Sequence, residues 1–279
     1  MFLMCPYKWY LSYVLNKKEE GRYKALEYGS AVHETLEEYF QSKLKGETVT
    51  QEEMVEIYDV MFDMHRIPFD SEEEKELFHH EGLMMINRLY NPINAMDKLL
   101  SSDEVEILGV EMELDLELPI KPVTRISIDE NGEEIEEEFE TAHIIGFIDL
   151  VLRTSEGIVI IDHKSGKNMF KKDKLETNLQ FPIYAMAIME KYGEMPHKCM
   201  YNFTKVHDFQ EVVVTEDRIA ESRKEIIKIF NKMGHPRLDI DGSPKFTAKP
   251  QFLCGWCDYG AKAMDICEPH KKYSKYKGR

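Results

Sequence analysis

The chain has 279 residues, with 36 Lys+Arg against 52 Asp+Glu, so its formal net charge is −16. Hydrophobic residues make up 43% of the chain, which is enough for a packed core and excludes a wholly disordered protein. The chain has no run of about 18 apolar residues, so we predict no membrane span. We also expect no secretory signal in the first residues. The acidity argues against a surface that coats nucleic acid, but it leaves room for a local groove.

The N-terminal third of the chain is predicted to be helical. Apolar residues recur at steps of three and four over residues 7–45 and again over residues 51–65. Ser71 followed by Glu74 resembles a capping box, which predicts a helix that runs to about Tyr90 before Pro92.

From Val110 onward, the spacing of apolar residues changes to every second residue. Apolar residues alternate with acidic ones from Val110 to Leu118, which predicts a half-buried strand with Glu111 on its polar face. Asn131-Gly132 predicts a hairpin within residues 123–141. The run 129–140 holds acids and no base, so we expect this hairpin to be solvated.

Shorter elements follow. We predict strands over 144–152 and 158–164, a helix over 175–192, strands over 198–206 and 210–215, and a helix over 216–233. Prolines and glycines in 234–250 indicate a linker or a wrapping loop. This order of elements predicts one α/β domain with a helical N-terminal part.

A carboxylate and a lysine end the apolar strand that begins at Ile158. Asp162 and Lys164 are two residues apart and therefore project from the same face of that strand. A turn centred on Ser155-Glu156 would pair Asp149 with Asp162, within reach of one cation. Two carboxylates suit Mg²⁺ or Mn²⁺, and the backbone carbonyl of His163 could supply a further oxygen. Lys164 could then orient or deprotonate a water and neutralise charge that develops on a phosphate.

A purely structural interpretation stays open at this point. Asp162 and Lys164 could form a salt bridge, with Asp149 an ordinary residue at a strand end. The pairing also depends on the type of turn, because a slip of two residues would separate the carboxylates.

Four short motifs resemble the PD-(D/E)XK nucleases, specifically their RecB-like branch. They are Gly29-x-x-x-His33, Gly146-x-x-Asp149, Asp162-x-Lys164 and Gln180-x-x-x-Tyr184, in the order of that family. The resemblance implies that Asp149, Asp162 and Lys164 are catalytic and that His33 is a further metal ligand. It implies that Gln180 and Tyr184 lie beside the site and bind the substrate. Glu111 stands where the family has an acidic residue on an earlier strand, so it becomes a candidate ligand too.

The resemblance also implies a fold and an activity. The fold is an α/β (α+β) restriction-endonuclease-like core, a mixed central sheet flanked by helices. A single nuclease domain would span 1–279, with a helical part at 1–100, the core at 101–233 and a cysteine-rich segment at 234–279. The implied activity is Mg²⁺- or Mn²⁺-dependent exonuclease cleavage of DNA, with single-stranded ends as substrate.

The implied setting is recombination, repair or phage DNA processing in the cytoplasm of a bacterial cell or a phage-infected host. No membrane partner is expected, whereas a recombination or replication protein could bind. The rival hypothesis is a catalytically silent nuclease fold that docks on such a partner. A basic cluster that includes Lys171 and Lys172 could contact phosphates, although a solvated loop explains it equally well.

Cysteines occur at both ends of the chain. Cys254-x-x-Cys257 and Cys267 lie near one end and Cys5 near the other, a pattern that favours a metal over disulfides when no export signal is present. It is similar to the iron–sulfur nucleases of the same branch, which include AddB-type subunits and CRISPR-adaptation nucleases. That similarity implies a [4Fe–4S] cluster held by these four residues, with a Cys₄ zinc site as the alternative. Cys199 falls in an apolar strand and is expected to be a buried thiol.

Overall fold

The computed structural model describes residues 1, 3–17, 23–90, 104–128, 131, 133–233, 246–251, 254, 257, 259–260 and 267. The chain divides into two compact units. Unit 1 comprises Met1–Gly21, Glu117–His143 and Arg223–Arg279, and unit 2 comprises Arg22–Leu116 and Ile144–Ser222. The units take up alternating stretches of chain, so the predicted three-part division along the sequence stays a prediction.

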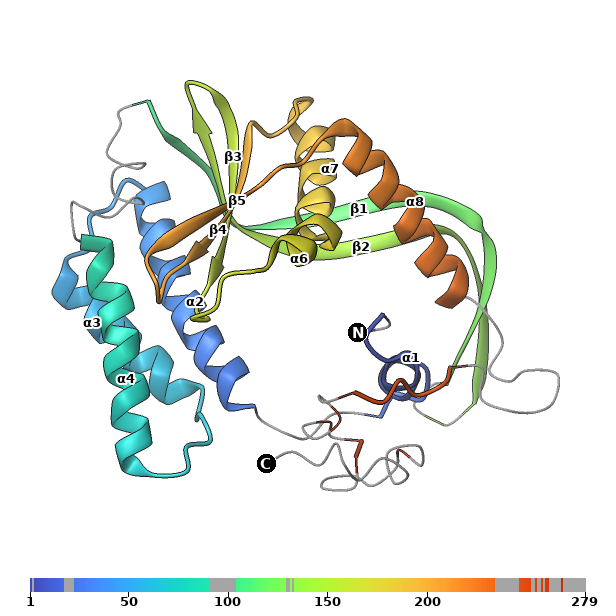
Figure 1. The fold of residues 1–279 in the computed structure, drawn as a ribbon, viewed down its shortest axis with the longest axis horizontal. Helices are drawn as coiled ribbons and strands as arrows, with labels where there is room; N and C mark the ends of the chain where they lie inside the picture. The colour runs from blue at the N-terminus through green and yellow to red at the C-terminus, as the bar shows by residue number, and fades with distance from the viewer. Residues whose placement is uncertain are drawn as a thin grey trace. The chain divides into compact units, whose positions relative to one another are not determined.

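Helices occupy the predicted regions, with some breaks (Figure 1). Their bounds are α1 Pro6–Trp9, η1 Tyr10–Val14, α2 Lys24–Leu44, α3 Gln51–Met64, α4 Glu72–Asn87, η2 Arg88–Tyr90, α6 Lys172–Thr177, α7 Gln180–Tyr192 and α8 Glu216–Met233. The region predicted to be helical over 7–45 contains α1, η1 and α2, and the helix predicted over 175–192 is two helices. Pro92 and most of the predicted loop 234–250 lie outside the described residues.

Side-chain caps explain where two of these helices begin. Thr50 and Glu53 form a complete capping box at the start of α3, each side chain bonding the other residue's backbone N–H. At α4 only half of the predicted box forms, because Ser71 Oγ accepts from Glu74 N at 3.2 Å whereas the Glu74 carboxylate accepts from Asp70 N at 2.8 Å. The helix start was predicted correctly, but the reciprocal partner of Glu74 is one residue earlier.

Five strands form one mixed sheet in the order β1-β2-β3-β4-β5. Their bounds are β1 Glu106–Ile128, β2 Glu134–Thr154, β3 Gly157–Lys164, β4 Lys198–Phe203 and β5 Asp208–Val212. β3 pairs antiparallel with β2 and parallel with β4, and β4 pairs antiparallel with β5. The parallel pair needs a crossover, which α6 and α7 supply. This arrangement confirms the predicted α+β class with a restriction-endonuclease-like sheet.

Two apolar cores cover the two faces of β3 in unit 2. Val159 and Ile161 pack with the buried faces of α2, α3 and α4, whereas Ile158 and Ile160 pack with α7. Six consecutive residues of β3, from Ile158 to His163, are buried. A strand covered on both sides accounts for the continuous apolar run in the sequence.

The strands β1 and β2 change their buried face in the middle of unit 2. Val110 belongs to the core beneath α2 but Met112 belongs to the core beneath α7, although residues two apart on a regular strand share a face. Ile148 and Leu150 on β2 are split in the same way. Glu111 lies between the first pair and Asp149 between the second, and Glu111 has φ +45°. The predicted regular alternation through Val110 is therefore wrong at that residue.

The β1–β2 hairpin continues into unit 1, where the described residues of its acidic stretch are mostly exposed, as predicted. Unit 1 has a small core in which Trp9 and Val14 pack with Phe246. Tyr259 links N-terminal and C-terminal segments, since its hydroxyl is 2.9 Å from Ser12 Oγ and donates to the Lys17 carbonyl at 2.5 Å. None of the described helices has the length and apolar character needed to cross a lipid bilayer.

Candidate active site

The end of β3 brings a buried carboxylate beside an ammonium. The Asp162 side chain is only 2% exposed and forms an ion pair with Lys164 Nζ through Oδ2, as the two-residue spacing predicts. Lys164 is 29% exposed, and its Nζ lies 5.5 Å from the ring centroid of Tyr201 on β4. The ammonium group of Lys164 is therefore held by Asp162 and Tyr201 but still reaches solvent.

Asp149 approaches Asp162 through the predicted register. β2 and β3 pair with Leu150 opposite Ile161, which is the register set by a turn at Ser155-Glu156. One step further along, Asp149 Oδ2 accepts a hydrogen bond of 2.7 Å from the backbone N–H of His163. The Asp149 carboxylate thus accepts a backbone N–H of β3, as a backbone carbonyl does in a regular sheet. It does so at the point where β2 changes its buried face.

Helix α2 adds an imidazole. His33 Nδ1 is 3.5 Å from Asp149 Oδ2. One turn earlier, Gly29 allows the helix to lie close to the exit of β3, because a Cβ at this position would be 3.3 Å from Ser165 Oγ. A side chain at position 29 would crowd Ser165, so the glycine of the Gly-x-x-x-His motif leaves room between α2 and the exit of β3.

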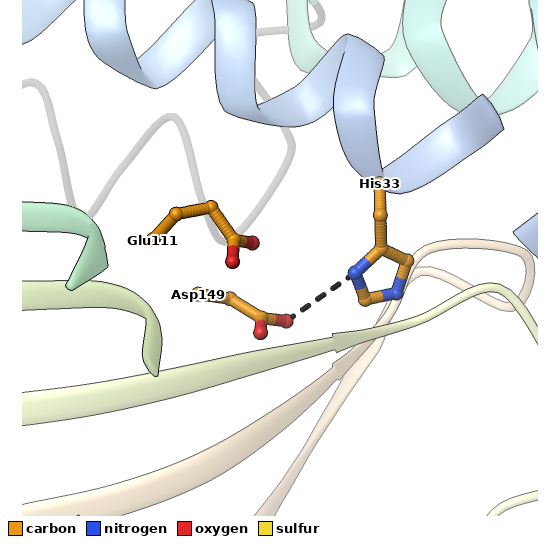
Figure 2. A group of neighbouring side chains, drawn as sticks. All are labelled: His33, Glu111 and Asp149. Carbon is orange, nitrogen blue, oxygen red and sulfur yellow. Dashed lines mark ion pairs between the residues drawn. The ribbon is translucent and has the colours of Figure 1, made fainter. Parts of the chain in front are cut away.

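Glu111 completes the cluster from β1. Donor atoms of His33, Glu111 and Asp149 all lie within 4.8 Å of one another, and Figure 2 shows the three side chains converging. Within the described part of the chain, this is the one group of at least three such donors that comes so close. A positive φ is unfavourable for a residue with a Cβ, and such strain is typical of functional sites. The unusual backbone separates Glu111 from its exposed neighbours Glu113 and Asp115.

The carboxylates of this cluster hold protons more tightly than usual. Burial raises the pKa of Glu111 to about 7, with further repulsion from Asp149, Glu37 and Asp162. Burial and the charge of Asp149 raise the pKa of Asp162 to about 6, although Lys164 opposes this. Burial likewise raises the pKa of Asp149. Carboxylates that repel one another in this way suit a site that binds a cation.

The two histidines of the site favour the neutral form. Burial lowers the pKa of His33, and burial lowers that of His163 to about 3. His163 stacks on Phe40 with ring centroids 5.4 Å apart, and its Nδ1 is 3.0 Å from Asn202 Nδ2. A neutral imidazole at His33 with the carboxylates of Glu111 and Asp149 makes a donor set that fits Mg²⁺ or Mn²⁺.

A cavity of about 660 Å³ opens over this cluster in unit 2. Its described lining includes Gly29, His33, Glu111, Asp149 and Ser165, and it contains several carboxylates but no Lys or Arg. An open, concave space above a set of perturbed carboxylates is the expected form of an active site.

A family model for the PD-(D/E)XK nuclease superfamily matches residues 1–262. The chain belongs to the PD-(D/E)XK nuclease superfamily. Membership makes it a nuclease-fold protein whose expected substrate is DNA and whose expected cofactor is a divalent metal. No curated protein sequence matches the chain.

The predicted Gln180 and Tyr184 lie against the superfamily's Asp-x-Lys residues. Gln180 Nε2 donates to Asp162 Oδ1 at 2.7 Å and to the Tyr184 hydroxyl at 3.0 Å. Tyr184 is only 8% exposed, and its hydroxyl donates to the same Asp162 oxygen at 3.5 Å. Both residues therefore orient Asp162, and their contact with substrate stays a prediction.

Sequence reasoning missed Tyr201 in this network. Its hydroxyl donates to Gln180 Oε1 at 3.1 Å and accepts from Asn178 Nδ2 at 2.8 Å. Tyr201 lies opposite Asp162 in the parallel register of β3 and β4. No local motif marks Tyr201. A hairpin turn sets the register of two antiparallel strands, but β3 and β4 are parallel and joined by a crossover, so their register cannot be counted from a turn.

Lys171 and Lys172 are exposed in unit 2, at the start of α6. Lys172 forms a pair of 3.6 Å with Glu176, one helical turn away. Both side chains remain accessible to a ligand, so their phosphate contacts stay a prediction.

The four cysteines proposed as cluster ligands all line one cavity of about 190 Å³ in unit 1. None of the five cysteines forms a disulfide. Backbone N–H groups point at two of the sulfurs, from Lys8 to Cys5 Sγ at 3.5 Å and from Gln251 to Cys254 Sγ at 3.3 Å. Among these described cysteines, no three sulfurs come within 4.8 Å of one another. Cys199 is 3% exposed, as predicted, and burial raises its pKa to about 12.

Proposed function

We propose that this protein is a Mg²⁺- or Mn²⁺-dependent deoxyribonuclease of the RecB-like branch that trims single-stranded DNA ends. One observation carries the proposal, namely that donors of His33, Glu111 and Asp149 converge within 4.8 Å. The ion-paired Asp162 and Lys164 lie at the end of the neighbouring strand β3. The preference for single-stranded ends rests on the family resemblance.

His33, Glu111 and Asp149 would hold the cation, with Asp162 and the backbone carbonyl of His163 as additional donors. The backbone of His163 lies beside His33, since a hydrogen bond between them raises the His33 pKa against the effect of burial. The cation would polarise the scissile phosphate and acidify a water.

Lys164 is the residue best placed to act on the reacting groups. Asp162 and the Tyr201 ring hold its ammonium, and its partial exposure leaves N–H donors for substrate. From this position the Lys164 ammonium can orient the attacking water. It can also neutralise charge on the phosphate as the P–O bond to the leaving oxygen breaks. Gln180 and Tyr184 would keep the Asp162 carboxylate in the orientation that this step needs.

The test is digestion of single-stranded DNA labelled at either end in turn, with Mn²⁺, Mg²⁺ or EDTA. We expect metal-dependent shortening by wild type and a loss of at least about 100-fold in the Lys164→Ala variant, the usual effect of removing one transition-state donor. Lys167→Ala is the matched control, because Lys167 is exposed a few residues further along the same segment. Persistence of a circular strand under the same conditions would identify the activity as exonucleolytic.

The rival is a catalytically silent fold that docks on a replication or recombination protein. It predicts that wild type and Lys164→Ala are equally inactive while both are folded and loaded with metal. Equal activity of the two proteins would instead reject the assigned site. The active form would process DNA in the cytoplasm of a bacterial cell or a phage-infected host.

We further propose that Cys5, Cys254, Cys257 and Cys267 hold a [4Fe–4S] cluster. Support comes from the shared cavity of about 190 Å³ and from the N–H donors aimed at Cys5 and Cys254. Four thiolates around one zinc, at about 2.3 Å each, would place the sulfurs about 3.8 Å apart. No three of the described cysteine sulfurs come that close to one another, so the choice between iron–sulfur and zinc rests on the family resemblance. The cluster would join distant parts of the chain within unit 1 and stabilise that unit.

Anaerobic purification followed by iron, sulfide and zinc analysis tests this second proposal. About four irons and four sulfides per chain are expected, with a visible absorption band that Cys254→Ser removes and Cys199→Ser retains. Stoichiometric zinc without iron would reject the cluster and establish the alternative metal.

A further inference from the structure

Large apolar side chains are exposed around the proposed catalytic site. Phe147 is 55% exposed and Ile145 is 75% exposed on β2, and Leu26 is 64% exposed on α2. Isolated exposed apolar residues are common on proteins, so exposure alone means little. Phe147 and Leu26, however, both line the cavity that contains His33, Glu111 and Asp149.

The positions of these side chains follow from the elements that carry the proposed ligands. Phe147 precedes Asp149 by two residues on β2, and both side chains line the cavity. Leu26 precedes His33 by two turns of α2 and shares its helical face. On each of these two elements, the proposed ligand is more buried than the apolar residue that lines the same cavity.

The charge around the cavity restricts what can occupy its apolar part. Glu34 and Glu37 line it together with Glu111 and Asp149, and no positive side chain is among its described lining residues. Phosphates are repelled here except at the cation itself. A substrate strand that places one phosphate on the cation must therefore present uncharged groups to the rest of this cavity. In DNA those groups are the sugars and the bases, and only the bases offer a flat face to an aromatic ring.

We propose that Phe147 is a stacking platform for the base of the nucleotide next to the cleaved bond, with Leu26 contacting that base from the opposite wall. The inference rests on the proposed nuclease function and names the side chain that would recognise its unpaired substrate. A paired base inside a duplex has neighbours on both faces, whereas an unpaired base offers a free face to an aromatic ring. The platform thus selects unpaired ends by a contact that does not depend on sequence.

The test measures binding in the cleavage-deficient Lys164→Ala background with Mn²⁺, by fluorescence anisotropy. Two labelled oligothymidylates are compared, one complete and one with abasic sites in its three terminal nucleotides at the end that wild type degrades. With Phe147 intact, we expect the complete strand to bind roughly 5- to 100-fold more tightly, the effect of stacking one base on an aromatic side chain.

Phe147→Ala should reduce this preference to less than about twofold, and Phe147→Trp should restore it. Val213→Ala is the matched control, since Val213 is 78% exposed and is not among the described residues that line the cavity. Phe147→Ala should leave the melting temperature nearly unchanged, because more than half of the residue's surface is exposed.

An unchanged preference in Phe147→Ala overturns the stacking platform while leaving the nuclease proposal intact, provided that wild type cleaves DNA. Absence of both cleavage and DNA binding overturns the two proposals together. If wild type self-associates in sedimentation experiments and Phe147→Ala alone abolishes this, the surface belongs to a second copy of the chain and the platform is rejected.

Discussion

Glu111→Gln provides the sharpest test of the proposed metal site, because stability and activity should change in opposite directions. Without a cation, the Glu111 carboxylate faces Asp149, Glu37 and Asp162, and burial with this repulsion raises its pKa from 4.5 to about 7. A raised folded-state pKa means that stability is fully present below pH 4.5 and is lost as pH rises through about 7. A neutral glutamine at position 111 removes this loss of stability at high pH.

The magnitude follows from the size of the pKa shift. At about 1.4 kcal/mol per pKa unit, the ionised Glu111 opposes folding by at most roughly 3 kcal/mol at pH 8. The side chain is only partly buried. Solvent screening therefore reduces the effect to about 1–2 kcal/mol. A gain of that size corresponds to a rise of about 2–8 °C in melting temperature for a chain of this class.

The assay is thermal unfolding by circular dichroism at pH 5 and pH 8, with EDTA or with Mn²⁺. Glu111→Gln should exceed wild type in EDTA at pH 8, approach it at pH 5, and gain far less from Mn²⁺. Metal affinity should fall at least tenfold or so, since loss of even an outer partner of a ligand has that effect. Glu113→Gln is the control, because it removes the same negative charge at an exposed position of β1. A Glu111→Gln protein that is no more stable in EDTA at pH 8, or equally stabilised by Mn²⁺, would refute the reasoning.

Three further outcomes are expected. Burial raises the pKa of Asp162 to about 6, and a cation binds only the ionised form. Mn²⁺ affinity should therefore fall by up to about tenfold per pH unit below pH 6, and calorimetry in buffers of different ionisation enthalpy should detect proton release on binding. Gly82→Ala places a Cβ 1.9 Å from the Tyr58 hydroxyl oxygen, so urea unfolding should show a loss of about 1–3 kcal/mol, whereas no loss would mean that Tyr58 moves freely. Cys267→Ser should lower the iron content and the melting temperature of anaerobically purified protein, and an unchanged iron content would exclude Cys267 as a ligand.

Local patterns predicted the elements and part of the site. The two-residue spacing of Asp162 and Lys164 and the turn at Ser155-Glu156 are short-range features, so the ion pair and the β2–β3 register follow directly from the sequence. The buried strand β3 and the start of α4 are likewise local consequences of composition and capping. Helix breaks were less predictable, since α6 and α7 separate where the chain turns at Asn178.

The alternation from Val110 to Leu118 shows the limit of such patterns. The sequence is equally consistent with Glu111 on a solvated acidic face and with Glu111 as a ligand. A positive φ at this one residue moves Val110 to the opposite core and separates Glu111 from Glu113. That backbone conformation depends on how β1 packs between two cores, which no local propensity specifies.

The sequence by itself determined which chemical groups are present and how they are spaced along each element: the Asp-x-Lys pair, the Gly-x-x-x-His turn of helix and the cysteines. Tertiary structure decided which groups meet. His33, Glu111 and Asp149 come from a helix and two strands, and Tyr201 reaches Gln180 only because β4 pairs in parallel with β3. The physical reason is that periodicity assigns a side chain to a face, whereas the distance between side chains on different elements depends on packing, sheet register and local backbone irregularities.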